Sequence, residues 1–327
     1  MFDIITFGSA TWDIFLRPEK FQIVKNKRFI TSKGICFNLG SKVNIKDIYF
    51  SSGGGGTNTA ATFSKQGFKV AYCATVGDDI AGKEIIGELR KLGIDIQFVF
   101  KTKLKPTNHS VVLSGGLKRD RTILVYQGAS ELLGKKDISW KKLKTKWFYL
   151  APLSGKLCRM TEDVVSFAYK NKIKIVFNPG NCQLSLSSET LKRILKKVDI
   201  LILNQEEASL LTKIPYQKEK EIFKKIDELC SGIAIMTKGP RGAVVSDGKR
   251  LYRAGILDIK VIDRTGAGDS FGSGFVSAFI RSNGSIEKAV QLATANAGSC
   301  LKGWGAKSGL LKKETKFKNV KIKKEKV

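Results

Sequence analysis

Short apolar runs alternate with longer amphipathic stretches along most of the chain. Runs typical of buried strands occupy residues 3–8, 70–74, 147–150, 173–177, 200–203 and 233–236. Helical patterns lie between them, for example at 57–66 and 80–92. Strands separated by helices of about 10 to 15 residues predict parallel βαβ units. We therefore expect an α/β fold with a mostly parallel sheet.

Two segments interrupt this rhythm. Residues 14–52 and 97–128 alternate apolar and polar positions, which is typical of half-buried antiparallel strands. We expect them to be inserted into the α/β core as a small sheet that covers a cleft. The core domain is expected to span residues 1–311, followed by a Lys-rich tail at 312–327.

Composition narrows the class of protein. The chain has 327 residues and 42% hydrophobic content, which suffices for a large core. No apolar run reaches the roughly 18 to 20 residues of a membrane span, and the first residues do not resemble a signal peptide. The six cysteines are scattered without a C-x-x-C pair, so we expect neither a zinc site nor a disulfide framework, and the cytoplasm is the default location. His109 is the only histidine, which excludes a His-rich metal site.

The formal net charge is +29. A balance this basic can indicate binding to nucleic acid or to a membrane surface. The lysines, however, are spread over predicted surface helices and are densest in the tail, without interleaved aromatic residues. Solvated faces are the favoured interpretation, and polyanion binding stays an alternative.

A glycine-rich turn near the end of the chain carries the main chemical signal. It reads Asp-Arg-Thr-Gly-Ala-Gly-Asp-Ser-Phe over 263–271 and opens a helix of small residues. The N–H groups of Gly266, Ala267 and Gly268 would converge on one point at the positive end of the helix dipole, which favours an anion. Asp269 follows at once and could accept a proton. An anion cradle beside a proton acceptor indicates phosphoryl transfer.

Elsewhere in the chain, polar residues lie just after predicted strands or in glycine-rich segments. Asp13 follows the first strand, where open α/β sheets bind ligands. A run of four glycines at 53–56 lets the backbone approach a polyol, and Asn58 offers both donors and acceptors. Asn204 and Glu207 lie on one face of a helical turn after the strand at 200–203.

These motifs together resemble the PfkB (ribokinase-like) carbohydrate kinases over about residues 1–310. The 263–271 string is similar to the family's Asp-Thr-x-Gly-Ala-Gly-Asp-x-Phe signature, with Arg264-Thr265 in place of Thr-x. The resemblance implies a ribokinase-like three-layer core with a small β lid. It also implies an enzyme that transfers the γ-phosphoryl group of ATP to a hydroxyl of a sugar or sugar-like molecule. Asp269 would act as the base, and the 266–268 turn would form the anion hole.

The resemblance also implies residues for each ligand. The substrate would be held by Asp13, Gly54, Gly55 and Asn58. The nucleotide would be held by Asn204, Thr237, Lys238, Gly239 and Asn296. Mg²⁺ would bind near Glu207 and Asn204, largely through water, and a monovalent cation such as K⁺ near Asp263, Thr265 and Ser308.

Two positions depart from ribokinases and leave the substrate open. Thr11 replaces an asparagine, and Gly55 replaces a lysine, so a positive charge is missing from the expected pocket. We expect the helix N-terminus to lower the pKa of Asp269 below about 3.9. A nucleoside kinase on the same scaffold and a non-catalytic nucleic-acid-binding protein are the alternatives. No membrane partner is expected, and edge strands of the lid could pair two copies as a homodimer.

Overall fold

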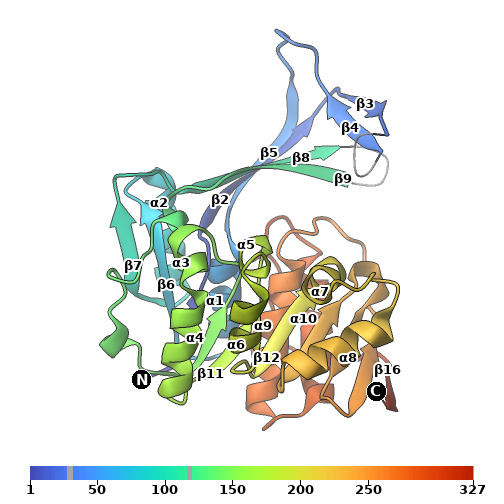
Figure 1. Ribbon diagram of the computed structural model, residues 1–327. Coiled ribbons are helices and arrows are strands. Elements are labelled where there is room, and N and C mark those ends of the chain that lie inside the picture. Colours follow the sequence, from blue (N-terminus) through green and yellow to red (C-terminus); the bar gives the residue numbers. More distant parts are fainter. Residues whose placement is uncertain (28–31, 116–119, 327) are drawn as a thin grey trace.

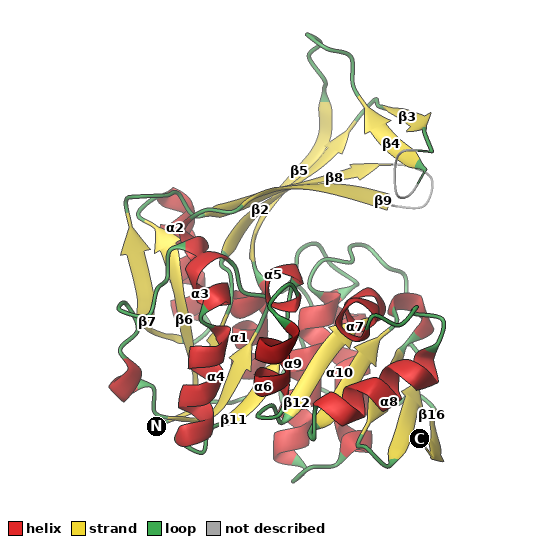
Figure 2. Ribbon diagram, in the orientation of Figure 1, coloured by secondary structure: helices red, strands yellow, loops and turns green. Residues whose placement is uncertain are grey.

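The body of the protein is a large sheet covered by helices on both faces (Figures 1 and 2). The computed structural model describes residues 1–27, 32–115 and 120–326, and within them ten strands form this sheet. In order across the sheet they are β16 (Ile322–Lys326), β15 (Arg250–Ala254), β14 (Ala243–Ser246), β13 (Ile233–Thr237), β12 (Ile200–Asn204), β11 (Lys174–Phe177), β10 (Thr145–Leu150), β1 (Phe2–Phe7), β6 (Val70–Gly77) and β7 (Asp95–Thr102). From β7 to β13 all neighbours are parallel, and β14 to β16 are antiparallel. The expected, mostly parallel sheet is confirmed.

The central strand β1 shows why the sheet needs two helical layers. Its side chains alternate, so Ile5 and Phe7 join one buried cluster, whereas Ile4 joins the other. The first cluster is covered by α3 (Gly155–Arg159), α4 (Thr161–Lys170), α5 (Asn181–Leu184), α6 (Ser188–Leu195), α7 (Gln205–Thr212) and α8 (Glu219–Leu229). The second is covered by α1 (Gly55–Lys65), α2 (Ile80–Lys91), α9 (Ala267–Arg281) and α10 (Ile286–Cys300). Short 3₁₀ turns occur at Ala129–Glu131, Trp140–Lys142 and Gly239–Arg241.

The lid is a four-stranded sheet that stands above the carboxyl ends of the parallel strands (Figure 1). Its order is β5 (Ile45–Gly53), β2 (Thr11–Pro18), β8 (Asn108–Gly115) and β9 (Asp120–Tyr126), and a hairpin of β3 (Gln22–Lys25) and β4 (Lys33–Cys36) extends from it. The lid is not purely antiparallel, because β2 and β8 run parallel. Residues 97–102, which the alternation placed in the lid, belong to β7 and pair with β6 in the main sheet. The reason is that Phe98 is buried in the core, so the second lid segment starts at Asn108.

The Lys-rich tail is folded onto the body. The Lys313 N–H donates to the Lys65 carbonyl at 3.1 Å, and the Gln291 side chain makes two 2.8 Å bonds with the Val320 backbone. β16 then pairs with β15 as the edge of the main sheet. Charged side chains on such an edge oppose pairing with other chains. The sequence pattern did not indicate this strand.

A disulfide joins Cys158 of α3 to Cys182 of α5, which the scattered cysteines had not predicted. The two residues are 24 positions apart. They meet because α3 follows β10, α5 follows β11, and these two strands are neighbours. Across the described ranges, the helices are too short or too polar to cross a membrane.

Candidate active site

The glycine-rich turn opens α9 as expected. Gly266 has a φ of +74°, and a Cβ at this position would lie 2.3 Å from the Cβ of Ala306. Only glycine therefore fits at the start of this helix. The Ala267 N–H makes a long 3.4 Å bond to the Arg264 carbonyl, and the N–H groups of the next residues lie in the first turn, where helices leave donors unpaired. The turn is thus suited to hold an anion.

Asp269 lies in this first turn and contacts α1. The Asn58 side-chain amide donates to Asp269 Oδ2 at 2.8 Å. Asn58 Oδ1 is buried and has no hydrogen-bond partner within the described residues. Burial raises the pKa of Asp269, while Asn58 and Lys307 lower it. The expected lowering of this pKa by the helix N-terminus was wrong, because desolvation of the carboxylate is the larger effect.

Asp13 faces the same cleft from β2. The Ser110 hydroxyl of β8 donates to Asp13 Oδ1 at 2.5 Å. Burial raises the pKa of Asp13 to about 6, while Ser110 and Lys307 lower it and the charges of Asp263 and Asp269 raise it further. A Cβ on Gly53, the glycine at the end of β5, would lie 1.9 Å from Asp13 Oδ2, so the carboxylate requires glycine there.

The glycines that follow connect the two carboxylates. Gly54 is the N-cap of α1, and a Cβ on Gly55 would lie 3.4 Å from Asp269 Oδ1. The structure therefore gathers Asp13, Gly54, Gly55, Asn58 and Asp269 around one space. These are the substrate and base residues that the sequence predicted.

A cavity of about 540 Å³ adjoins the turn. Ala267 and Gly268 form one end of its wall, and apolar side chains such as Leu257 and Phe271 line the rest. Thr237 and Gly239 also line it, as predicted for nucleotide contacts. Its size and apolar lining suit a nucleotide base and sugar.

Asn296 does not line this cavity. Its side chain is fully buried, donates to the Ser270 carbonyl at 2.8 Å and accepts from the Leu311 N–H at 2.9 Å. Because these bonds join α10 to α9 and to Leu311, just before the tail, the amide is occupied with holding the fold. Thr294, Ala297 and Gly298 face the cavity from α10 instead.

A more polar hollow of about 410 Å³ lies next to this cavity and is lined by Asn204, Thr237, Lys238 and Gly239 among others. The Lys238 ammonium is paired with Glu219 of α8. Asn204 and Glu207 cap α7 reciprocally, with bonds of 2.7 and 2.8 Å between side chain and backbone. Burial raises the pKa of Glu207.

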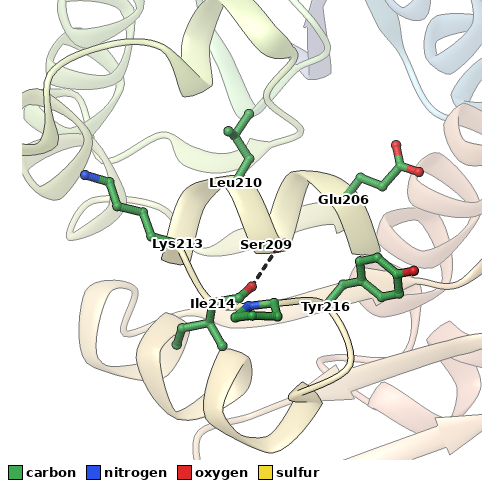
Figure 3. Close-up of a pocket in the computed structure, with 7 residues that line it drawn as sticks. Glu206, Ser209, Leu210, Lys213, Ile214 and Tyr216 are labelled. Carbon is green, nitrogen blue, oxygen red and sulfur yellow. Dashed lines mark hydrogen bonds between the residues drawn. The ribbon is translucent and has the colours of Figure 1, made fainter. Parts of the chain in front are cut away.

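A third hollow, of about 490 Å³, borders α7 on its outer side (Figure 3). Ser209 donates to the Ile214 carbonyl at 2.6 Å beneath it. The side chains of Glu206 and Lys213 point in opposite directions in Figure 3. The lining of this hollow includes neither Asp269 nor the residues of the glycine-rich turn.

The residues expected to hold a monovalent cation lie in one loop region. Asp263 Oδ1 accepts from the Thr265 N–H and hydroxyl at 3.1 and 3.0 Å, and its Oδ2 accepts from the Gly305 N–H at 3.1 Å. Arg121 of the lid reaches Asp263 Oδ1 at 3.7 Å. Ser308 lies in the same loop, packed against Gly303. In the described part of the chain, His, Cys, Asp and Glu side chains form no cluster of three that could hold a metal.

Three residues of the site were missed by sequence reasoning. Ser110 and Arg121 come from lid strands, where a serine or an arginine carries no signal of its own. Lys307 is buried within the loop Gly-Trp-Gly-Ala-Lys-Ser, and its burial could not be read from a chain this rich in lysine. All three became visible only through the tertiary contacts.

A carboxylate at a helix terminus suited to an anion, next to a nucleotide-sized cavity and beneath a lid, is the arrangement expected of a nucleotide-dependent phosphotransferase. The particular family follows from sequence. The model of the pfkB family carbohydrate kinases matches residues 19–313, and the chain belongs to this family. It is an ATP-dependent kinase of the ribokinase type, acting on a sugar or a nucleoside.

Known kinases of several specificities resemble the chain, among them ribokinases, a deoxyribokinase, a 6-phosphofructokinase and a nucleoside kinase. A ribokinase of Haemophilus influenzae is 29% identical over 273 residues, covering 79% of this chain and 83% of that protein. A nucleoside kinase of Methanocaldococcus jannaschii is 25% identical, covering 79% and 82%. The crystal structure of Arabidopsis thaliana ribokinase with ribose and ATP superposes with a TM-score of 0.77 at 21% identity, covering 96% of each chain. The ribokinase-like fold is thereby confirmed.

Proposed function

We propose that this enzyme transfers the γ-phosphoryl group of ATP to a hydroxyl of a small sugar-like acceptor, with Asp269 as the proton acceptor. The observation that carries the proposal is the position of Asp269. Its carboxylate is fixed by Asn58 at 2.8 Å and adjoins the Gly266–Gly268 turn, which also lines the nucleotide cavity. The acceptor hydroxyl and the transferred group would then meet between the carboxylate and the turn.

Each group of residues has a separate role in the proposed reaction. Asp13 and the unpaired Oδ1 of Asn58 accept hydrogen bonds from hydroxyls of the substrate, because both present buried oxygen atoms with free lone pairs. Asp269 accepts the proton of the reacting hydroxyl, whose oxygen bonds to phosphorus as the bond to the ADP oxygen breaks. The backbone donors of the turn stabilise the negative charge on the transferred group. The lid excludes water, which would otherwise compete as the acceptor.

Mg²⁺ fits beside the nucleotide cavity. Glu207 is one carboxylate at the N-terminus of α7, and Mg²⁺ needs only one or two carboxylates besides phosphates and water. Glu207 and Asn204 would hold it through water, and it would neutralise the charge of the phosphates. The predicted K⁺ site at Asp263, Thr265 and Ser308 stays a prediction; comparing activity in K⁺ and Na⁺ buffers tests it.

Asp269→Asn tests the assignment of the base. The variant keeps the shape and the Asn58 contact, but its amide cannot accept the proton. We expect ATP binding within about twofold of the parent and turnover lowered by about 10² to 10⁴. Calorimetric ATP titration and a coupled ADP assay measure the two quantities. Near-normal turnover would contradict the role of Asp269.

A nucleoside acceptor is the second candidate, favoured by the similarity to a nucleoside kinase. Thr11 and Gly55 do not decide between the two. A phosphorylation panel of sugars, sugar acids and nucleosides, each at the same concentration, separates them by kcat/KM. Filter binding of RNA at several salt concentrations, run beside the panel, tests the non-catalytic nucleic-acid alternative.

The lid supports a proposal on assembly. Ile48, Phe50, Leu124 and Tyr126 share its outer face, and each is between 45% and 56% exposed. A second copy would cover this face with the same apolar residues, as two-fold interfaces do. We therefore expect a homodimer, measurable as twice the chain mass by light scattering. Phe50→Lys should shift the protein to the monomer.

A further inference from the structure

Lys307 is a buried lysine in the loop after α10. Its side chain is 7% exposed. The ammonium donates to the Ser52 hydroxyl and, at 3.2 Å, to Glu88 Oε2 of α2. Ser52 in turn donates to Glu88. Burying an ammonium is costly unless it is paired, so a structural or chemical gain must offset the cost.

This loop contacts both halves of the acceptor site. Ser52 precedes Gly53, against which the Asp13 carboxylate packs. Two residues before Lys307, the Gly305 N–H donates to Asp263, which also binds Thr265 just before the catalytic turn. Lys307 therefore enters between the base of the lid and the turn that opens α9.

The charges around Lys307 explain its position. Asp13 of β2 is faced by Lys307, Asp263 and Asp269, and Asp269 of α9 by Lys307 and Asn58. Glu88, Asp13 and Asp269 are the carboxylates whose charge acts on Lys307. Lys307 in turn lowers the pKa of Asp13 and of Asp269, against the effect of burial.

We propose that Lys307 is a positioning residue for phosphoryl transfer, which supplies the positive charge absent at Gly55 and keeps Asp13 and Asp269 as carboxylates. This inference rests on the proposed function, because only that function gives the negative charges of Asp13 and Asp269 a role in the reaction. Asp269 must be ionised to accept the proton, and an ionised Asp13 presents only hydrogen-bond acceptors to the hydroxyls of the substrate. Lys307 acts on both without needing to touch the acceptor.

Two variants separate charge from packing. Both Glu88→Gln and the double variant Lys307→Met/Glu88→Gln lose the Lys307–Glu88 ion pair, but only the double variant loses the ammonium. Removing both partners avoids an unpaired buried charge, so the double variant should fold. Thermal unfolding and ADP titration check that both variants keep the fold and the nucleotide site.

The first readout does not depend on activity. Carbon-13 NMR titration of labelled aspartate carboxyls, assigned with Asp13→Asn, follows Asp13 directly. We expect its midpoint to rise by about one pH unit or more in the double variant, since an opposite charge nearby shifts a pKa by roughly 1 to 3 units. In Glu88→Gln the midpoint should stay or fall. Equal midpoints in the two variants would overturn the proposal.

The second readout is the pH profile of kcat/KM with the best acceptor of the panel. The acidic limb should move to higher pH by a similar amount in the double variant only, and Lys307→Arg should keep the parental limb. Identical profiles in the two variants would show a purely structural role and would also overturn the proposal. If the parent phosphorylates no acceptor, the proposed function fails, while the NMR result still decides on Lys307.

Discussion

At the scale of single residues, the acceptor site places carboxylates where their charge is unfavourable. Asp13 is 5% exposed, and its pKa is raised to about 6. The pKa of this carboxyl is therefore higher in the folded protein, about 6, than in the unfolded chain, near 3.8. The contribution of Asp13 to stability is fully present below pH 3.8 and is lost as the pH rises through about 6. At neutral pH the ionised Asp13 therefore lowers the free energy of unfolding.

Asp13→Asn should consequently stabilise the protein in a pH-dependent way. The shift from 3.8 to about 6 corresponds to an upper limit of about 3 kcal/mol at pH 8 and almost nothing at pH 4. Urea unfolding at both pH values measures the difference, and acceptor KM should rise strongly at the same time. Asp47→Asn, on the exposed end of the same lid sheet, is the control and should change neither quantity. A gain of the same size at pH 4 would contradict the charge argument.

The sequence predicted only those site residues that lie within a recognisable motif. Asp13, Asn58 and Asp269 lie in recognisable strings, and the structure brings them together. Their electrostatics could not be predicted, because burial depends on which distant segments cover a side chain. For the same reason Asn296 was expected at the nucleotide, although its amide is bonded to Ser270 of α9 and to Leu311.

At the scale of elements, an ion pair ties the lid to the loop that precedes the glycine-rich turn. Arg121 lies on β9, two residues before Ile123, whose partner Val112 shares the cleft face with Ser110. Its guanidinium is 3.7 Å from Asp263, which in turn binds Thr265 and Gly305. Closure of the lid and the shape of the turn are thus linked through Asp263.

Arg121→Gln should loosen the attachment of the lid to the body. A partly exposed ion pair contributes about 1 kcal/mol at most, so we expect acceptor KM to rise up to about fivefold, with more ATP hydrolysis in the absence of acceptor. Coupled assays with and without acceptor measure both effects. Arg17→Gln removes a pair of similar chemistry that lies entirely within the lid, between Arg17 and Asp47, and should leave both values unchanged. An equal effect of the two substitutions would argue against the link.

The order of strands and helices could be predicted from the spacing of apolar residues, because buried parallel strands are nearly continuous apolar runs. Membership in one sheet or the other did not follow. The alternation at 97–102 resembles that of the lid, yet Phe98 packs in the core and β7 pairs with β6. Period distinguishes a strand from a helix, but pairing partners are set by long-range contacts.

At the scale of the whole molecule, the C-terminal strand is connected to the nucleotide side by charges. Glu325 of β16 pairs with Arg253 at 2.7 Å, and Arg253 shares Glu219 with Lys238. Lys238 lines the hollow beside the nucleotide cavity. The last strand therefore supports the position of Lys238, a residue predicted to contact the nucleotide.

Truncation after Lys321 should show this connection. We expect a Tm lower by several degrees, because the β15 edge is uncovered, and a severalfold higher KM for ATP. Differential scanning calorimetry and ATP titration of the reaction rate measure these effects. Glu325→Gln keeps the strand but removes the ion pair, so it should raise KM with little loss of Tm. Truncation without any change in KM would mean that the ion-pair chain does not reach the nucleotide.

The two faces of the lid carry a consequence for mutational scans of β9. Ile123 and Val125 lie on the cleft face, whereas Leu124 and Tyr126 lie on the outer face. Substitutions at odd-numbered positions of β9 should therefore change the choice of acceptor, and those at even-numbered positions should change self-association, although the positions are adjacent in the sequence. A one-residue insertion or deletion at the start of β9 would exchange the two sets. Such a register shift within the strand should abolish both properties in one step, a pattern that no point substitution in β9 should reproduce.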